Sequence, residues 1–238
     1  MTNHSHMPDC HKCSYRENSA FRCLEAETLD ILNQGKSFQI YQKGEILFHA
    51  GDNADRFFCI MTGTVRTFRT LAETGKEQTF KIKSSGDWIG CRDTILSGRY
   101  NHSAVCISDV EACVVPRHLL SALQADSLFQ QELLEQIARF YRESENHLYS
   151  LGTKQTHAKL AEFLLNLYES NHHEKQIHID ITREVMASII GTTTESVIRA
   201  LSDFKARGWI QLDKSKVIFL NLSALKGMSQ IENELIAY

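Results

Sequence analysis

The chain has 238 residues, a formal net charge of −3, 42% hydrophobic residues and 23% charged residues. This composition is typical of a globular protein with one large or two modest domains. No apolar run approaches membrane-spanning length and no apolar signal region opens the chain, so we expect a cytoplasmic protein without a membrane partner. Seven cysteines in such a chain indicate metal binding, redox chemistry or burial rather than a disulfide framework.

Residues 1–26 form a polar arm that carries three cysteines, Cys10, Cys13 and Cys23. Two residues between Cys10 and Cys13 let both sulfurs face one metal centre. Because the arm shows no apolar pattern, we expect no core that could bury these thiols, which favours ligation. A thiol-rich tail without a ligand is the alternative.

Residues 27–125 read as a β domain preceded by a short amphipathic helix at 27–33. Short β-type segments separated by Gly and Asp turns predict an all-β barrel or roll. They are 37–41, 45–49, 56–61, 64–70, 77–83, 88–91, 103–107 and 110–115. A brief helix is expected at 117–124.

Residues 126–152 predict one long helix. Six of its residues form a stripe with a spacing of 3.5, which is typical of a coiled-coil seam. They are Leu133, Ile137, Phe140, Ser144, His147 and Leu151. Packing against the β domain would explain the same stripe. Ser144 and His147 interrupt its apolar character, so a dimer formed through it would be marginal and therefore switchable.

Residues 153–238 predict a winged helix-turn-helix. After an amphipathic helix at 154–170 and a strand at 177–181, Thr182 can cap a helix that ends at a Gly191 turn, and a second helix follows at once. A hairpin, 208–212 with 217–220, supplies the wing. Residues 223–238 are expected to form a short helix and tail.

The second helix of this pair would enter the major groove of double-stranded DNA. Glu195 and Arg199 lie four residues apart, where they suit the cytosine amino group and the guanine edge of one base pair. A capping box at 192–195 and a Glu195–Arg199 ion pair are the structural alternative. The full set of predicted DNA-contacting residues is Thr182, Thr192, Thr193, Thr194, Glu195, Ile198, Arg199, Lys214 and Lys216.

The acidic excess lies within residues 126–177, and the segments on either side are balanced. A neutral DNA-binding domain attracts phosphates weakly, so specific binding should depend on dimerisation.

The order of these domains resembles the cyclic-AMP receptor protein/fumarate–nitrate regulator (CRP/FNR) superfamily of bacterial transcription factors. The resemblance rests on residues 45–52 and 57–65, on Gly86-Asp87-Trp-Ile-Gly90, and on the segment from Ile181 to Arg199. It implies an α+β protein with a β-roll, a dimerisation helix and a winged helix. Such a protein is expected to form a homodimer and to interact with RNA polymerase. No phosphate loop, nucleophile elbow or paired carboxylates indicate an enzyme.

In the cyclic-nucleotide branch of this family, a Glu after the Gly86-Asp87-x-x-Gly90 motif and a later Arg-Ser pair hold the ligand. This chain has Cys91 and His102-Ser103 at those positions. Without the Arg fork the phosphate lacks its bidentate partner, which argues against a cyclic nucleotide.

The oxygen-sensing branch implies a different ligand, a [4Fe–4S] cluster held by three cysteines of the arm and one late in the roll. Cys10, Cys13, Cys23 and Cys113 fall on those positions, although nine residues separate Cys13 from Cys23, a longer gap than in the family pattern. Cys59, Cys91 and Cys106 read as core thiols, with Cys91 the substitute should Cys113 lie away from the arm.

The resemblance further implies that the cluster senses oxygen, redox state or nitric oxide and controls dimerisation and DNA binding. A palindrome of the type TTGA-N6-TCAA is expected, its half-sites about 34 Å apart, with Ile198 contacting a thymine methyl group. Three alternatives remain: zinc or thiol redox chemistry with a histidine, a haem bound by His49, His102 or His147, and no N-terminal cofactor.

Overall fold

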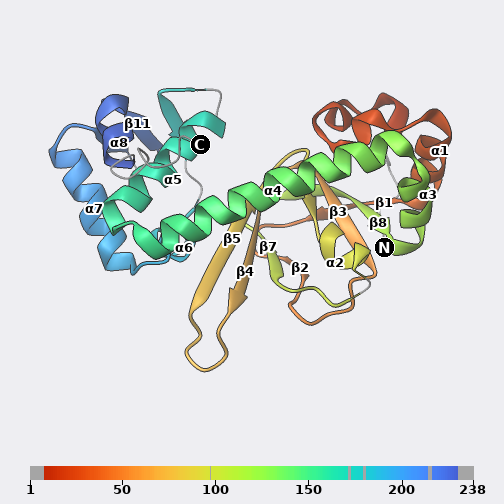
Figure 1. Ribbon diagram of the computed structural model, residues 1–238, viewed down its shortest axis with the longest axis horizontal. Helices are drawn as coiled ribbons and strands as arrows, with labels where there is room; N and C mark the ends of the chain where they lie inside the picture. The colour runs from red at the N-terminus through yellow and green to blue at the C-terminus, as the bar shows by residue number, and fades with distance from the viewer. Residues whose placement is uncertain (1–7, 97, 171–172, 179–180, 214–215, 230–238) are drawn as a thin grey trace. The chain divides into compact units, whose positions relative to one another are not determined.

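In a computed structural model, residues 8–96, 98–170, 173–178, 181–213 and 216–229 are described (Figure 1). They form two compact units, Met1–Tyr141 and Arg142–Tyr238. The division falls inside the long predicted helix, α4, which spans Ser127–Thr153. The predicted DNA contact Lys214 and residues 230–238 of the predicted C-terminal tail lie outside the described residues.

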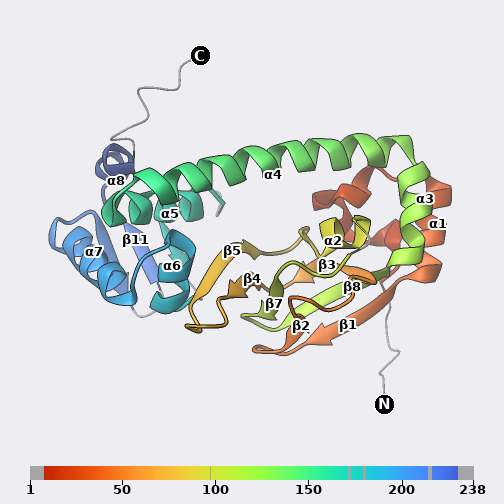
Figure 2. The ribbon, with the colours of Figure 1, turned by 60° about the horizontal axis from the view of Figure 1, so that its bottom comes forward.

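The first unit contains a β-roll of two antiparallel sheets (Figure 2). One has the strand order β1-β8-β3-β6 and the other β2-β7-β4-β5. Their bounds are β1 Ser37–Tyr41, β2 Ile46–Phe48, β3 Arg56–Thr62, β4 Val65–Thr70, β5 Glu77–Lys83, β6 Trp88–Ile89, β7 Ser103–Cys106 and β8 Val110–Pro116. All eight predicted strands are therefore present. The fold class predicted from the sequence is confirmed.

Apolar side chains of β3 and β8 point to both faces of the β1-β8-β3-β6 sheet. Because neighbouring side chains of a strand point to opposite faces, Phe58 and Ile60 enter the core between the sheets. Phe57 and Cys59 enter a second core on the outer face of the sheet. A sheet that is apolar on both faces must be covered on both.

The cover of the outer face comes from the N-terminal arm, α1 (Ala26–Gly35) and the helices after β8. Three short 3-10 helices occupy the arm, at Cys10–Lys12, Ser14–Asn18 and Ala20–Cys23. Phe21 is buried, and its ring centroid lies 4.8 Å from that of Trp88 and 6.4 Å from that of Phe129. The expectation that the arm has no core to enter is therefore wrong, because Phe21 and Leu24 anchor it in one.

Two local features differ from the sequence prediction. Cys91, expected at the end of a strand, begins a short helix, α2 (Cys91–Ile95), because Gly90 adopts a left-handed φ of 83° and turns the chain. The helix predicted at 117–124 is a 3-10 turn at Arg117–Leu119 followed by α3 (Leu120–Ala125).

The second unit is a winged helix-turn-helix with one apolar core. Its elements are α5 Thr156–Ser170, β9 Gln176–His178, α6 Arg183–Ile190, α7 Thr194–Ala206, β10 Ile210–Asp213, β11 Lys216–Phe219 and α8 Leu222–Ser229. The wing hairpin pairs Ile210 with Phe219, and β9 adds a third strand to it. Among the described residues, no helix is long and apolar enough to cross a bilayer.

Phe21→Ala tests whether the arm is docked on the sheet. Deleting this buried ring should lower the free energy of unfolding of the first unit by about 3–5 kcal/mol. Leu71→Ala, at a position that is 53% exposed, should change it by less than about 0.5 kcal/mol. Guanidinium unfolding followed by Trp88 fluorescence, in a Trp209→Phe background, measures both. An equal, small effect of the two substitutions would mean that the arm is not anchored.

Candidate nucleic-acid interface and thiol cluster

The helix-turn-helix is built by two capping threonines and one glycine. Thr182 caps α6 as predicted, its hydroxyl accepting a hydrogen bond from the Val185 amide at 3.3 Å. Gly191 ends α6 in the left-handed region at φ 65°. Thr193, rather than the Thr192 of the predicted capping box, then caps α7 by accepting from the Ser196 amide. Thr192 instead pairs with the Thr156 hydroxyl at 3.3 Å.

The two faces of α7 have different environments. Val197, Ala200, Leu201 and Phe204 are buried in the core of the second unit. Glu195, Ile198 and Arg199 are exposed on the opposite face, and Thr194 is half-buried beside them.

The alternative reading of Glu195 and Arg199 as an ordinary ion pair is supported only in part. The guanidinium of Arg199 donates to the Ser196 hydroxyl at 3.4 Å. Hydrogen bonds from its own backbone and from Thr193 lower the pKa of Glu195, and the charge of Arg199 also lowers it. An ionised acceptor and a forked donor thus remain available at one helix face.

Cationic side chains flank this face. Lys205 and Lys216 are exposed. Arg207 pairs with Asp203 at 2.9 Å and lies over the Trp209 ring, so part of its charge is already balanced.

In the first unit, the structure brings together three of the four predicted cluster ligands. Cys10, Cys13 and Cys113 belong to the outer-face core of the β1-β8-β3-β6 sheet, together with Cys59 and Cys91. Burial is the main cause that raises the pKa of the Cys113 thiol to about 11, with Lys36 lowering it and Cys10 and Cys13 raising it.

The fourth predicted ligand, Cys23, has a different environment. It is half-buried and lies outside that core. Burial raises the pKa of its thiol, Glu132 and Asp126 raise it as well, and Arg22 lowers it. Cys91 and Cys106 are buried as predicted, and burial raises the pKa of Cys91 to about 12.

No three His, Cys, Asp or Glu side chains within the described part of the chain are arranged to hold a single metal ion. Binding at the thiols would therefore require them to draw together. In the arm, His11 hydrogen-bonds Asp30 at 2.8 Å. Burial lowers the pKa of His102, which lies 3.8 Å from Asp93.

The segment that would hold a cyclic nucleotide, residues 86–103, contains two arginines, Arg92 and Arg99, that the sequence analysis did not single out. Arg99 donates to the Gly51 carbonyl at 2.7 Å. The Arg92 guanidinium is paired with the buried Asp93 carboxylate, at 3.0 Å from Nε and 3.3 Å from Nη2. The Ser103 hydroxyl accepts a hydrogen bond from the Ala50 amide. All three groups therefore already have protein partners.

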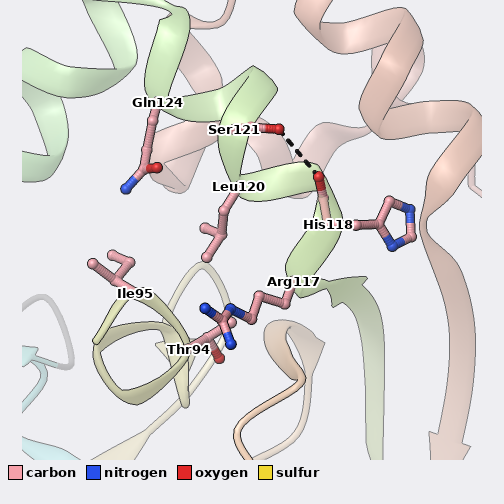
Figure 3. Close-up of a pocket in the computed structure, with 7 residues that line it drawn as sticks. All are labelled: Thr94, Ile95, Arg117, His118, Leu120, Ser121 and Gln124. Carbon is pink, nitrogen blue, oxygen red and sulfur yellow. Dashed lines mark hydrogen bonds between the residues drawn. The ribbon is translucent and has the colours of Figure 1, made fainter. Parts of the chain in front are cut away.

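An open pocket of about 440 Å³ lies between α2 and the turn that leads into α3 (Figure 3). It is lined by Thr94, Ile95, Arg117, His118, Leu120, Ser121 and Gln124. None of the residues predicted to bind a ligand lines it.

The apolar stripe of α4 is only partly the predicted one. Leu133 packs against the outer-face core, so it is not available to a second chain. The most exposed apolar side chains are Leu134 (68%), Tyr141 (65%) and Leu148 (71%), with Ile137 beside them. Together with Ser144 and Leu151 they follow a spacing of three and four residues, one position away from the predicted Phe140 and His147.

Comparison with known proteins identifies both halves of the chain. Residues 38–127 match the cyclic nucleotide-binding domain family, and residues 158–228 match the Crp-like helix-turn-helix domain family. The CRP-like cAMP-activated global transcriptional regulator of Mycobacterium tuberculosis is 30% identical over 83% of this chain and 90% of that protein.

Two further relatives cover most of the chain. The fumarate and nitrate reduction regulatory protein of Salmonella typhimurium is 25% identical over 92% of this chain and 90% of that protein. The structure of FixK2 from Bradyrhizobium japonicum, 24% identical, covers 81% of this chain and 96% of that chain with a TM-score of 0.74. The fold is therefore shared.

Thr193→Ala should destabilise the second unit by about 1 kcal/mol, because it removes the side-chain cap of α7. Thr192→Ala is the matched control. It loses one hydroxyl contact outside the helix and should cost less. Thermal unfolding of the isolated variants compares them. A larger loss for Thr192→Ala would place the cap where the sequence pattern predicted it.

Proposed function

This chain belongs to the CRP/FNR family of transcription regulators, and from that premise we propose that its sensor unit detects oxygen or redox state, including nitric oxide, through a thiolate-bound [4Fe–4S] cluster. The winged helix-turn-helix makes the protein a DNA-binding regulator. The proposal concerns the signal, the bases that are read and the way in which two copies pair.

The observation that carries the sensing proposal is the group of buried thiols under the N-terminal arm. Cys10, Cys13 and Cys113 belong to one core, and the buried side chain of Lys36, which is 5% exposed, acts on Cys10 and Cys113. Lys36 hydrogen-bonds the thiol of Cys10 and lowers its pKa, against the larger rise due to burial. A cation placed among thiols favours their ionised, ligating form.

A bound cluster supplies a redox-active, oxygen-labile group at this point. The residues around it couple its presence to the rest of the unit. Cys10 and Cys13 belong to the arm, and the amide of Cys10 donates to Asn33 of α1 at 3.0 Å. The same core includes Phe129 and Leu133 of α4. Loss of thiolate ligation would therefore loosen the packing at the start of this helix.

Homodimerisation, typical of this family, is proposed through the exposed face of α4. Leu134, Ile137, Tyr141 and Leu148 provide the apolar contacts, and Ser144 interrupts them. A seam with a polar interruption is weaker than a fully apolar one. A small change at the start of the helix, of about 1–3 kcal/mol, is then sufficient to shift the pairing equilibrium.

Paired copies would present α7 to adjacent major grooves about 34 Å apart. Glu195 and Arg199 would select a G·C pair, and Ile198 would contact a thymine methyl group. The phosphates and groove edges would be contacted by Thr182, Thr192, Thr193, Thr194 and Lys216. RNA polymerase is the expected further partner of such a regulator.

Cyclic nucleotide sensing is the second candidate, since the 30% identical relative is named as cAMP-activated. In this chain, the charges of residues 86–103, the segment that would hold the ligand, disfavour cyclic nucleotide binding. Arg92 is already paired with Asp93, a carboxylate that is 4% exposed, and an incoming phosphate would meet that negative charge.

The sensing proposal is tested by preparing the protein without air and measuring its iron and sulfide content and its DNA affinity before and after exposure to air. We expect iron and sulfide in equal amounts and DNA binding that weakens as they are lost. Isothermal titration with cyclic AMP runs in parallel and should give no heat. Colourless protein that binds DNA only with cyclic AMP would replace this proposal with the second candidate.

Arg199→Ala should cost about 1–3 kcal/mol of operator affinity and relax the preference for guanine at one position of each half-site. Lys205→Ala, the control, removes a cation that would contact only phosphate and should weaken binding to every sequence alike. Competition binding against a panel of single-base operator variants separates the two effects. A uniform loss for Arg199→Ala would reduce this residue to a phosphate contact.

Leu148→Glu should shift the protein toward monomers, because it places a charge in the proposed apolar seam. Asn146→Glu adds the same charge at an exposed position outside the seam and should leave pairing unchanged. Sedimentation velocity over a range of concentrations measures both. Equal dimerisation of the two variants would mean that the dimer interface does not include Leu148 and lies elsewhere on the chain.

A further inference from the structure

A connection of two residues, Lys154 and Gln155, joins the end of α4 to the start of α5. The Lys154 amide donates to the Ser150 carbonyl at 3.1 Å, and the Lys159 amide donates to the Gln155 carbonyl at 3.0 Å. Hydrogen bonds of helical spacing therefore reach the connection from both sides. So short a connection allows only a few arrangements of one helix against the other.

The side chain of Lys154 links this connection to α5 and α8. The side chain is 6% exposed, and its ammonium group lies 3.3 Å from the Glu162 carboxylate of α5 and donates to the Ser229 carbonyl of α8 at 3.1 Å. The Ser150 hydroxyl of α4 donates to the same Glu162 oxygen at 2.6 Å. A buried ammonium group is stable only beside a compensating anion. Because the network supplies that anion and a carbonyl acceptor, it favours one arrangement of the three helices.

The end of α4 also contacts the turn of the helix-turn-helix. The Lys159 ammonium of α5 donates to the Leu151 carbonyl at 2.8 Å. A Cβ added at Gly191, between α6 and α7, would come within 2.8 Å of the Leu151 Cδ2 atom. The hydroxyls of Thr156 and Thr192 lie 3.3 Å apart. The last turn of α4 and the first turn of α5 are therefore packed on the segment that leads into α7.

The exposed apolar face assigned to pairing extends into the same unit. Leu148 is 71% exposed and lies less than one helical turn before Ser150 and Leu151. In a homodimer paired through this face, the arrangement of each α4 end against its own helix-turn-helix determines where α7 lies. A rigid connection would fix the distance and the angle between the two copies of α7, and hence the separation of the half-sites that they reach.

We propose that Lys154 is a positioning residue that determines which half-site spacing the dimer accepts, by holding the end of α4 on α5 and α8. Gly152 lies inside α4 and is not a hinge of this connection. The inference rests on the proposed pairing through α4 and the proposed contact of α7 with DNA. One base pair added between the half-sites moves one of them by about 3.4 Å and turns it by about 35°. A rigid dimer does not follow that change, whereas a dimer with a loose connection does.

The test compares the affinity of the full chain, prepared without air, for TTGA-N6-TCAA and for the same half-sites separated by one base pair fewer or more. Wild-type protein should prefer the N6 duplex by at least about tenfold, because a half-site that cannot be engaged at the same time adds no avidity. Lys154→Met keeps an unbranched side chain without the charge and should reduce the preference to less than about threefold. Lys226→Met, the control, removes the charge of an exposed lysine of α8 and should retain the wild-type preference.

Two further variants separate positioning from a general loss of stability. Glu162→Gln removes the compensating charge with little change in volume and should relax the preference as Lys154→Met does, so it decides the question should Lys154→Met not fold. Gly152→Ala places a methyl group where nothing lies within 4 Å and should leave the preference unchanged. General unfolding would weaken binding to every duplex alike and would not alter the ratio between spacings.

A wild-type preference in folded Lys154→Met and Glu162→Gln would overturn the inference and leave the proposed function intact. A preference relaxed by Gly152→Ala alone would also overturn it, because the hinge would then lie inside α4. Wild-type protein that binds the three duplexes equally would reject the proposed pairing, and this inference with it.

Discussion

The first unit depends on covering both apolar faces of one sheet. Side chains alternate along β3 and β8, so the β1-β8-β3-β6 sheet cannot leave its outer face in water. The N-terminal arm meets this requirement through Phe21, which packs on Trp88, Phe57 and Phe129. The same docking lays Cys10 and Cys13 over the strands that carry Cys59 and Cys113. Packing of the sheet and the proposed gathering of the thiols therefore have one cause.

Helix α4 joins this core to the exposed apolar face that we assign to pairing. Phe129 is fully buried and Leu133 packs beside it, whereas Leu134 and Leu148 are exposed. Asp126 ties the start of the helix to the end of the arm, since its carboxylate accepts from the Glu25 amide at 2.9 Å and the Phe129 amide at 3.0 Å. A change in the thiol core would thus reach the dimer face through a few contacts along one helix.

Local patterns were sufficient to predict much of this molecule. Period-two alternation predicts the eight strands of the roll, and Thr182, Gly191 and the wing turn predict the helix-turn-helix, because these signals act within a few residues. Fold class and membership of the regulator family follow from their order. The capping residue of α7 differs by one position, since Thr192 and Thr193 are equally good caps and tertiary contact with Thr156 decides between them.

Contacts between residues far apart in the sequence could not be predicted from such local patterns. Nothing in the letters 56–61 reveals that Cys59 will face Cys113, because strand register and the face covered by the arm are set by the whole sheet. The family spacing selects Cys23 by counting residues and not contacts, and its role as a ligand stays a prediction. The exposed apolar stripe of α4 is displaced by one position from the predicted one because Leu133 packs against the core of the first unit. A 3.5-residue period alone does not show which side chains that core takes up.

The central claim is that ligation by the thiols and docking of the arm stabilise each other. Hydrogen–deuterium exchange of anaerobic protein, with and without bound iron and sulfide, tests it most directly. The account predicts that loading slows exchange at the amides of residues 10–24 and of β3 and β8, and leaves the amides of α7 unchanged in the absence of DNA. Exchange in the arm that is the same in both states would contradict it.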